Sequence, residues 1–292
     1  MAEALRNLRK VWSRNPMKLS IVLSTHSAQF QAVAFKGDFE ANVAKIAGWG
    51  YDGVELAIRD PRLVDGDELE RVVSAHGLVV PAIGTGQAWG EEGLSFTSDD
   101  PAVRAAAVER IKSHVPLAAR FDAVIVLGLI RGITPAGRGR PAGQTHEQSL
   151  SYLVAALQEC AAVAARTGVR FALEPLNRYE TDLVHTVADG LDLIERVGAG
   201  NLGLLLDTFH MNIEEPVIEE SIRACGDRIF HFHVADSNRW YPGAAHLDFE
   251  SILSTLSATG YQGYVSGEFM PLPDADTAAQ RGIAHLRAVA PM

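Results

Sequence analysis

Three carboxylates and one imidazole stand at the ends of apolar segments in the second half of the chain, and together they could hold a metal ion. Glu174, Asp207 and Glu268 each close such a segment, and His233 stands one residue before the end of another. Carboxylate oxygens with one imidazole nitrogen and room for water suit Mn²⁺, Mg²⁺ or Co²⁺ better than a closed thiolate zinc site does. Clustered carboxylates repel one another, and a divalent cation removes that repulsion.

Each of these residues also has a simpler structural interpretation. Glu174 could merely end a strand, Asp207 could cap a helix or a turn, and Glu268 could form a surface ion pair. His231 and His233 are two residues apart and share one face of a strand, so one of them could be a hydrogen-bonded core histidine. Four such residues at the ends of successive strands are not independent accidents, so the metal site is the better hypothesis.

The four residues belong to a regular alternation of strand-like and helix-like segments. The strand-like runs are mostly apolar, which is typical of parallel strands covered on both faces, and they span 18–24, 52–58, 78–84, 122–129, 169–174, 202–207, 228–234 and 263–268. Amphipathic helical segments are expected at 39–48, 67–76, 101–120, 146–168, 186–197, 214–225, 248–259 and 275–289. Eight such units predict an α/β fold, a (β/α)8 TIM barrel, in which the carboxyl ends of the strands converge on one face.

A doubly wound parallel sheet is the alternative fold, but the GxGxxG turn typical of that fold does not follow the first predicted strand. Residues 17–292 are expected to form one barrel domain, since no linker-like segment divides the alternation. Residues 1–16 are predicted to be a mobile N-terminal extension. This stretch is rich in arginine and lacks the apolar region of a secretory signal.

Composition excludes several classes of protein. The net charge is −10, from 26 basic and 36 acidic residues, which argues against a nucleic-acid partner. No apolar stretch approaches the roughly 20 residues that span a bilayer, so no membrane association is expected. The two cysteines, Cys160 and Cys225, form no CxxC pair, which argues against a disulfide scaffold and favours a cytoplasmic location.

The second half of the chain resembles the D-tagatose/D-allulose (psicose) 3-epimerases, a family of xylose isomerase-like barrels. The resemblance lies in EPLNRYETD (174–182), LDTFHMNIEE (206–215), HVADSNRWYPG (233–243) and GYVSGE (263–268). Successive members of the set Glu174, Asp207, His233 and Glu268 are 33, 26 and 35 residues apart, which is similar to the spacing of that family's metal ligands.

The first half resembles a different branch of these barrels, the 5-keto-L-gluconate epimerases. The similar segments are MKLSIVLST (17–25), AFKGDFE (34–40), AIRDP (57–61), AIGTGQA (82–88) and LGLIRG (127–132). This resemblance implies a keto-sugar acid of the 5-keto-L-gluconate/D-tagaturonate type as substrate, whereas the ketose 3-epimerase resemblance implies a free ketose.

These resemblances also imply roles for individual residues. Glu174, Asp207, His233 and Glu268 would bind the metal, with Mn²⁺ preferred over Mg²⁺, Co²⁺ or Zn²⁺, and Glu174 and Glu268 would act as paired acid and base. Glu180, His210 and Arg239 match positions that hold the carbonyl end of the substrate. The enzyme would be an isomerase of the ketose 3-epimerase type, and a homodimer or homotetramer is expected.

Two arginines that follow predicted strands suggest a site for an acidic substrate. Arg59 follows the second strand and Arg131 follows the fourth. A guanidinium matches a carboxylate with two parallel hydrogen bonds. One of these residues is therefore predicted to bind the carboxylate of a keto-sugar acid.

Three other functions are compatible with parts of this pattern. An aldose–ketose isomerase would use the same scaffold but move a proton between adjacent carbons. A metal-dependent endonuclease would need a histidine-rich site with several metal ions and a basic groove, which the charge disfavours. A non-catalytic metal-binding or sugar-binding protein would use the same ligands without turnover.

Overall fold

The apolar segments of the sequence form parallel strands that close into a barrel. The computed structural model describes residues 17–134 and 144–291, so the predicted extension at residues 1–16 lies outside the described residues. Neighbouring barrel strands follow one another along the chain, and the last strand pairs with the first. The eight strands are β1 (Lys18–Ser24), β3 (Gly53–Ala57), β4 (Ala82–Gly84), β5 (Val124–Leu127), β6 (Phe171–Leu173), β7 (Leu202–Asp207), β8 (Ile229–Val234) and β9 (Tyr264–Gly267).

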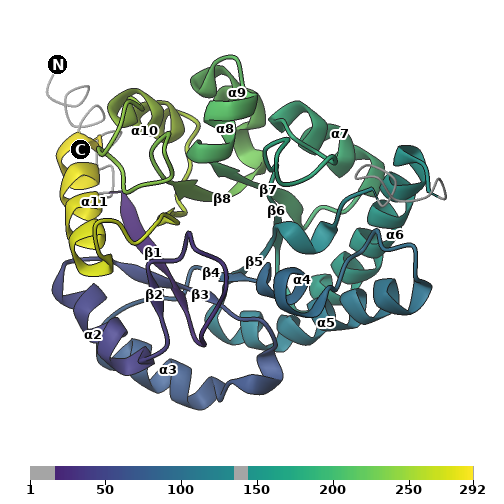
Figure 1. Cartoon of the computed structure of the whole chain (residues 1–292), viewed down its shortest axis with the longest axis horizontal. Helices are drawn as coiled ribbons and strands as arrows, with labels where there is room; N and C mark the ends of the chain where they lie inside the picture. Colours follow the sequence, from purple (N-terminus) through teal and green to yellow (C-terminus); the bar gives the residue numbers. More distant parts are fainter. Residues whose placement is uncertain (1–16, 135–143, 292) are drawn as a thin grey trace, which may run out of the picture.

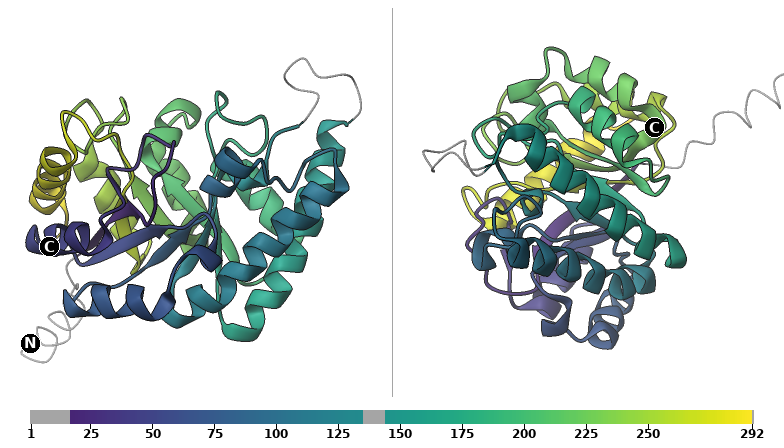
Figure 2. Two further views of the ribbon diagram at one scale, coloured as in Figure 1. Left: turned by 60° about the horizontal axis from the view of Figure 1, so that its bottom comes forward. Right: turned by 90° about the vertical axis from the view of Figure 1, so that its right-hand side faces the viewer.

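Helices surround the closed sheet, as Figure 1 shows, and the predicted (β/α)8 TIM barrel is confirmed. The long helices α5 and α6 lie side by side along one flank (Figure 2). The helices that follow the barrel strands are α2 (Phe39–Gly48), α3 (Gly66–Ala75), α5 (Pro101–Phe121), α6 (His146–Ala164), α7 (Val187–Val197), α8 (Thr208–Glu214), α9 (Ile218–Cys225), α10 (Phe249–Ala258) and α11 (Ala275–Val289). Within the described ranges, 17–134 and 144–291, no helix combines the length and apolar character needed to cross a membrane.

Several local features differ from the sequence prediction. The helix expected at 214–225 begins later, as α9 at Ile218, because Pro216 lacks an amide proton and disfavours helical backbone at the residue before it, and the short helix α8 that precedes it was not predicted. The short strand β2 (Phe35–Lys36), which pairs with β1, and the short helix α4 (Gln87–Glu92) were not predicted. The strand expected at 78–84 is shorter, since only Ala82–Gly84 pairs continuously and Val79 makes an isolated bridge.

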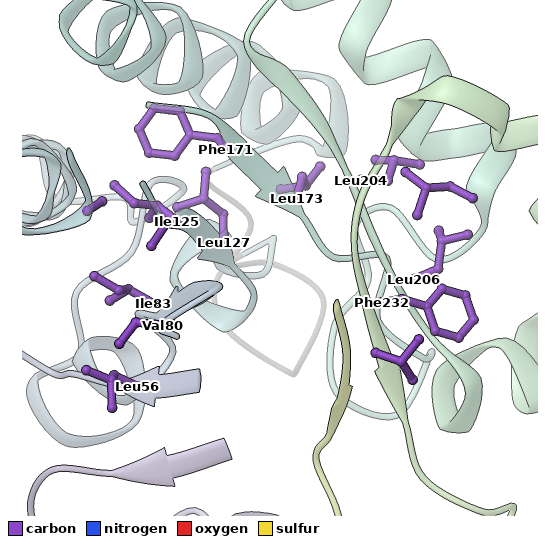
Figure 3. Close-up of a cluster of buried hydrophobic side chains, with 14 of the residues drawn as sticks. Leu56, Val80, Ile83, Ile125, Leu127, Phe171, Leu173, Leu204, Leu206 and Phe232 are labelled. Carbon is purple, nitrogen blue, oxygen red and sulfur yellow. The ribbon is translucent and has the colours of Figure 1, made fainter. Parts of the chain in front are cut away.

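Successive side chains along each barrel strand point alternately toward the barrel interior and toward the surrounding helices. On β7, Leu202, Leu204 and Leu206 belong to the main apolar cluster, which lies between the strands and the helices. Figure 3 shows labelled members of this cluster on neighbouring strands, among them Leu206 and Phe232. The other parity of β7 faces the barrel interior, where Leu205 packs in a second small cluster and Asp207 ends the strand.

Gly203 lies on this interior parity at a point where no side chain fits. A Cβ there would lie 2.5 Å from Cγ of Phe230 and 2.6 Å from the carbonyl oxygen of Arg228. Gly203→Ala is therefore expected to lower the free energy of unfolding by about 1–3 kcal/mol, the usual cost of overpacking a core. Urea denaturation measures the loss, with Gly200→Ala as the control because no atom lies within 4 Å of its added Cβ. Equal stability of the two variants would contradict this account of the interior.

Candidate metal centre and active site

The four predicted metal ligands meet at the carboxyl ends of four adjacent strands. Glu174 follows β6, Asp207 ends β7, His233 lies on β8 and Glu268 follows β9. One nitrogen or oxygen atom from each side chain lies within 4.8 Å of the corresponding atoms of the other three. The first three side chains are buried and the Glu268 side chain is 15% exposed, so the cluster lies at the bottom of a depression with one side open.

Several atoms of this cluster are buried without a hydrogen-bond partner. Within the described part of the chain, Oε1 of Glu174, Oδ2 of Asp207 and Nδ1 of His233 have none. Burying an unpaired polar or charged atom costs about 1–3 kcal/mol, so three of them around one point indicate a site for a ligand. Three carboxylates and one imidazole are a donor set that suits a hard divalent cation with open positions for substrate or water, and the residues present fit such an ion.

Asp207 combines both interpretations that the sequence left open. Its Oδ1 accepts a hydrogen bond of 2.8 Å from the amide of Phe209 and caps helix α8. Its Oδ2 is one of the unpartnered atoms of the cluster. The cap fixes the carboxylate and leaves one oxygen directed at the site.

Burial makes these carboxylates difficult to ionise in the absence of a cation. It raises the pKa of Glu174 well above its ordinary value, and the neighbouring Glu268 raises it further. Burial likewise raises the pKa of Asp207, and it raises the pKa of Glu268 to about 7, although His233 and Arg239 act against it. For His233, burial lowers the pKa, but Glu55 and Glu268 outweigh burial and raise it to about 10. The electrostatics of the cluster therefore favour binding of positive charge.

His210 presents a proton donor to the same point. Its Nδ1 accepts a hydrogen bond of 3.3 Å from the amide of Asn177, so the ring proton is on Nε2. That Nε2 lies 3.6 Å from Oε1 of Glu174 and 3.8 Å from Oδ2 of Asp207. Burial, together with Arg239, lowers the pKa of His210 well below 6.5, so the ring is a neutral donor.

Arg239 and Glu180 form a pair at the rim of the cluster. Nη1 of Arg239 donates to Oε1 of Glu180 at 2.8 Å, and Nη2 lies 3.7 Å from Oε2 of Glu268. The guanidinium also stacks 4.6 Å above the ring of Phe209. The structure thus places Glu180, His210 and Arg239 beside the four predicted metal ligands.

A cavity of about 280 Å³ opens in front of the cluster. Among the described lining residues Arg239 is the one arginine or lysine. The other lining side chains come largely from the segments after β1, β4 and β5, where Phe30, Val33, Trp89 and Leu129 are apolar. The same segments also contribute the polar side chains Gln29, Gln87 and Glu91. The cavity is thus acidic at the metal cluster and mixed apolar and polar elsewhere.

The structure does not bring Arg59 and Arg131 to this cavity. Arg59 pairs with Glu91 at 2.5 Å and with Glu92 at 3.3 Å. Arg131 is fully buried in a short 3₁₀ turn, where it donates to the backbone carbonyl oxygen of Glu174, and burial lowers its pKa to about 10. Neither guanidinium lines the cavity, so their positions give no support to the predicted carboxylate site.

Glu55 is a member of the site that sequence reasoning missed. It lies in the middle of β3, is 1% exposed, lines the cavity and contacts both His231 and His233. Burial raises its pKa, but the two imidazoles outweigh burial, and the net pKa is well below the ordinary value. A signal was present in DGVELAI (52–58), because a charged residue in the middle of an apolar strand is seldom buried without a partner.

Comparison with known proteins identifies similar chains. A family model described as a xylose isomerase-like TIM barrel matches residues 43–289. The L-ribulose 3-epimerase of Methylomonas sp. is 33% identical over 248 residues, covering 81% of this chain and 82% of that protein. A D-psicose 3-epimerase from Clostridium cellulolyticum, solved with D-tagatose, has a TM-score of 0.81 at 25% identity and covers 94% and 100% of the two chains. The 3-keto-D-glucoside 4-epimerase of E. coli has a TM-score of 0.80 at 25% identity, with 93% and 99% coverage.

Proposed function

The chain belongs to the xylose isomerase-like TIM-barrel family, and on that premise we propose that it is a divalent-metal-dependent epimerase acting on a keto sugar. Relatives named as L-ribulose and D-psicose 3-epimerases, which are isomerases acting on ketoses, support this activity. The observation that carries the proposal is the set of three buried, unpartnered atoms on Glu174, Asp207 and His233. We propose Mn²⁺ as the ion.

Epimerisation next to a ketone requires the removal of a C–H proton from one face of the carbon and its return on the other. Glu174, Asp207, His233 and Glu268 would hold a divalent ion that, when bound, would supply Lewis-acid stabilisation of the negative charge that develops on the ketone oxygen, worth several kcal/mol. Glu174 takes the proton on one face and Glu268 returns one on the opposite face, because a single carboxylate cannot reach both. The reverse reaction exchanges the two roles. A positioned proton-transfer group of this kind supplies roughly 10²–10⁴-fold.

The other residues orient the substrate and screen its charge. His210 donates from Nε2 to a substrate oxygen beside Glu174. Arg239, held by Glu180, supplies a cation beside Glu268 and favours the ionised form of that carboxylate. The apolar lining residues Val33, Trp89 and Leu129 limit the access of water to the substrate.

The charges that line the cavity support one substrate class over the other. A keto-sugar acid of the 5-keto-L-gluconate/D-tagaturonate type would bring a carboxylate into the cavity. Among the described lining residues the one arginine or lysine is Arg239, and it already pairs with Glu180. A neutral keto sugar is therefore favoured over a keto acid, in agreement with the neutral substrates in the names of the relatives. We further propose that the enzyme is cytoplasmic and assembles as a homodimer or homotetramer.

Deuterium exchange tests the reaction directly. The Mn²⁺-loaded protein is incubated in D₂O with D-tagatose, D-fructose or D-tagaturonate, and the proton NMR spectrum is followed. For a neutral ketose, we expect the signal of the proton on the carbon next to the ketone to disappear while the epimer of that ketose accumulates. Exchange with D-tagaturonate alone would transfer the enzyme to the keto-acid branch. Appearance of an aldose would indicate an aldose–ketose isomerase, and no exchange in any sample would leave a non-catalytic binding protein.

A further inference from the structure

Glu55 reaches across the barrel interior to the histidine of the metal cluster. It lies on β3, whereas His231 and His233 lie on β8, and these two strands are not neighbours in the sheet. Oε2 of Glu55 lies 2.7 Å from Nε2 of His231 and 3.0 Å from Nε2 of His233, and its Oε1 lies 3.1 Å from the latter. All three side chains are about 1% exposed, so water does not compete for these hydrogen bonds.

These hydrogen bonds determine which nitrogen of His233 is free. An ionised carboxylate can only accept hydrogen bonds, so Nε2 of His233 carries a proton and donates a hydrogen bond to Glu55. Nδ1 is the remaining ligand atom, and it is the unpartnered atom of His233, 3.9 Å from Oε2 of Glu268. We propose that Glu55 and His231 are positioning residues that hold His233 with Nδ1 directed at the metal centre. This inference rests on the proposed metal site, although its test does not depend on epimerase activity.

His231 supplies the second half of this arrangement. Nε2 of His233 faces both oxygens of Glu55, and the donor from His231 to Oε2 restrains the carboxylate from a second direction. The two imidazole rings lie edge to face, with centroids 5.2 Å apart and planes at 77°. His231 therefore fixes Glu55, and Glu55 fixes the orientation and tautomer of His233.

A second metal ion between Glu55 and the two histidines is the competing explanation. Ligand atoms about 2.0–2.2 Å from a tetrahedral ion lie about 3.3–3.6 Å from one another. The observed separations of 2.7–3.1 Å are hydrogen-bond lengths and are too short for atoms on opposite sides of an ion. The three residues therefore support the neighbouring metal centre and do not form another.

Metal affinity is the measurement that tests this inference. Metal-free protein is titrated with Mn²⁺ alone in a calorimeter. Glu55→Gln is expected to raise the dissociation constant about 10–100-fold, as loss of a carboxylate behind a ligating histidine does elsewhere. His231→Phe, which removes the donor and keeps the ring, is expected to weaken binding less. His231→Gln keeps an N–H near the position of Nε2 and is expected to restore affinity close to that of the wild type.

Glu214→Gln provides the matched control. Glu214 is also a nearly buried carboxylate, with a side chain 5% exposed, but it pairs with Arg178 and does not line the cavity. Its replacement is expected to leave Mn²⁺ affinity unchanged. In the Co²⁺-substituted proteins, the visible absorption bands are expected to change for Glu55→Gln and to match the wild type for Glu214→Gln.

The outcomes separate this inference from the proposed function. Folded Glu55→Gln and His231→Phe proteins that bind Mn²⁺ as tightly as the wild type would overturn it. If Glu55→Gln does not fold, wild-type affinity in folded His231→Phe would overturn it alone, and weakened affinity that His231→Gln restores would support it. Wild-type protein that binds Mn²⁺ but epimerises no keto sugar would refute the proposed reaction and leave the affinity comparison valid.

Discussion

Replacement of Glu268 by glutamine is expected to lower kcat by about 10²–10⁴-fold, the range supplied by a positioned proton-transfer group. Glutamine has nearly the same size as glutamate and retains one oxygen toward the metal centre, but it cannot accept a proton from carbon. The carboxyl end of β9 and the contact of residue 268 with Arg239 would otherwise be little altered. Turnover at saturating Mn²⁺, followed by chromatographic separation of the two epimers, measures the loss.

Glu174→Gln is expected to show a loss of kcat of similar size. Comparison of the two variants shows which glutamate acts on which face of the substrate carbon. With Glu268 replaced, deuterium exchange in D₂O should persist only for the epimer whose C–H bond faces Glu174. With Glu174 replaced, it should persist only for the other epimer. Glu214→Gln, whose carboxylate pairs with Arg178 outside the cavity, should leave kcat unchanged. A Glu268→Gln enzyme with wild-type kcat would rule out the two-carboxylate mechanism.

Much of the candidate site could be predicted because strand alternation and strand ends are both visible in the sequence. In LGLLLD (202–207), every second residue faces the helices, so the terminal aspartate must lie on the interior parity. The same argument places Glu174 after β6 and Glu268 after β9. Since the carboxyl ends of barrel strands converge on one face, the fold alone predicts that residues separated by 33, 26 and 35 positions lie close together.

Contacts across the barrel interior could not be predicted in the same way. Glu55 and His231 are 176 residues apart on strands that do not pair, and no local pattern specifies which interior side chains meet. Arg131 shows the opposite problem. It follows a strand, but the chain turns there into a 3₁₀ helix that directs the guanidinium into the protein and onto the carbonyl of Glu174. The direction of a side chain just beyond a strand depends on the turn, which periodicity does not encode.

Removal of the metal is expected to abolish turnover and to make stability depend strongly on pH. In the metal-free protein, burial raises the pKa values of Glu174 and Asp207, and it raises that of Glu268 to about 7. The folded protein then holds protons that the unfolded chain, with ordinary carboxyl pKa values near 4, has already released. These carboxylates therefore make the free energy of unfolding fall as pH rises from about 4.5 to above 7. The lowered pKa values of His210 and His231 act in the opposite direction below about pH 6.5, so the net fall is expected near and above pH 7. The raised pKa of His233 acts in the same direction as the raised carboxyl pKa values, whereas the lowered pKa of Glu55 acts only below about pH 4.5.

Added Mn²⁺ should cancel this loss, because it binds the ionised carboxylates. At a free concentration 100-fold above the dissociation constant, it adds about 2.7 kcal/mol of stability. In a chain of this size that raises the melting temperature by roughly 4–5 °C. Calorimetric scans of chelator-treated and Mn²⁺-loaded protein between pH 5 and pH 8 should diverge as pH rises. Asp207→Asn, which removes one of the unpartnered oxygens from the cluster, should reduce the Mn²⁺-dependent shift. Identical melting curves at pH 8 would mean that the three carboxylates hold no cation, since their buried charge would then have to be neutralised by protons alone.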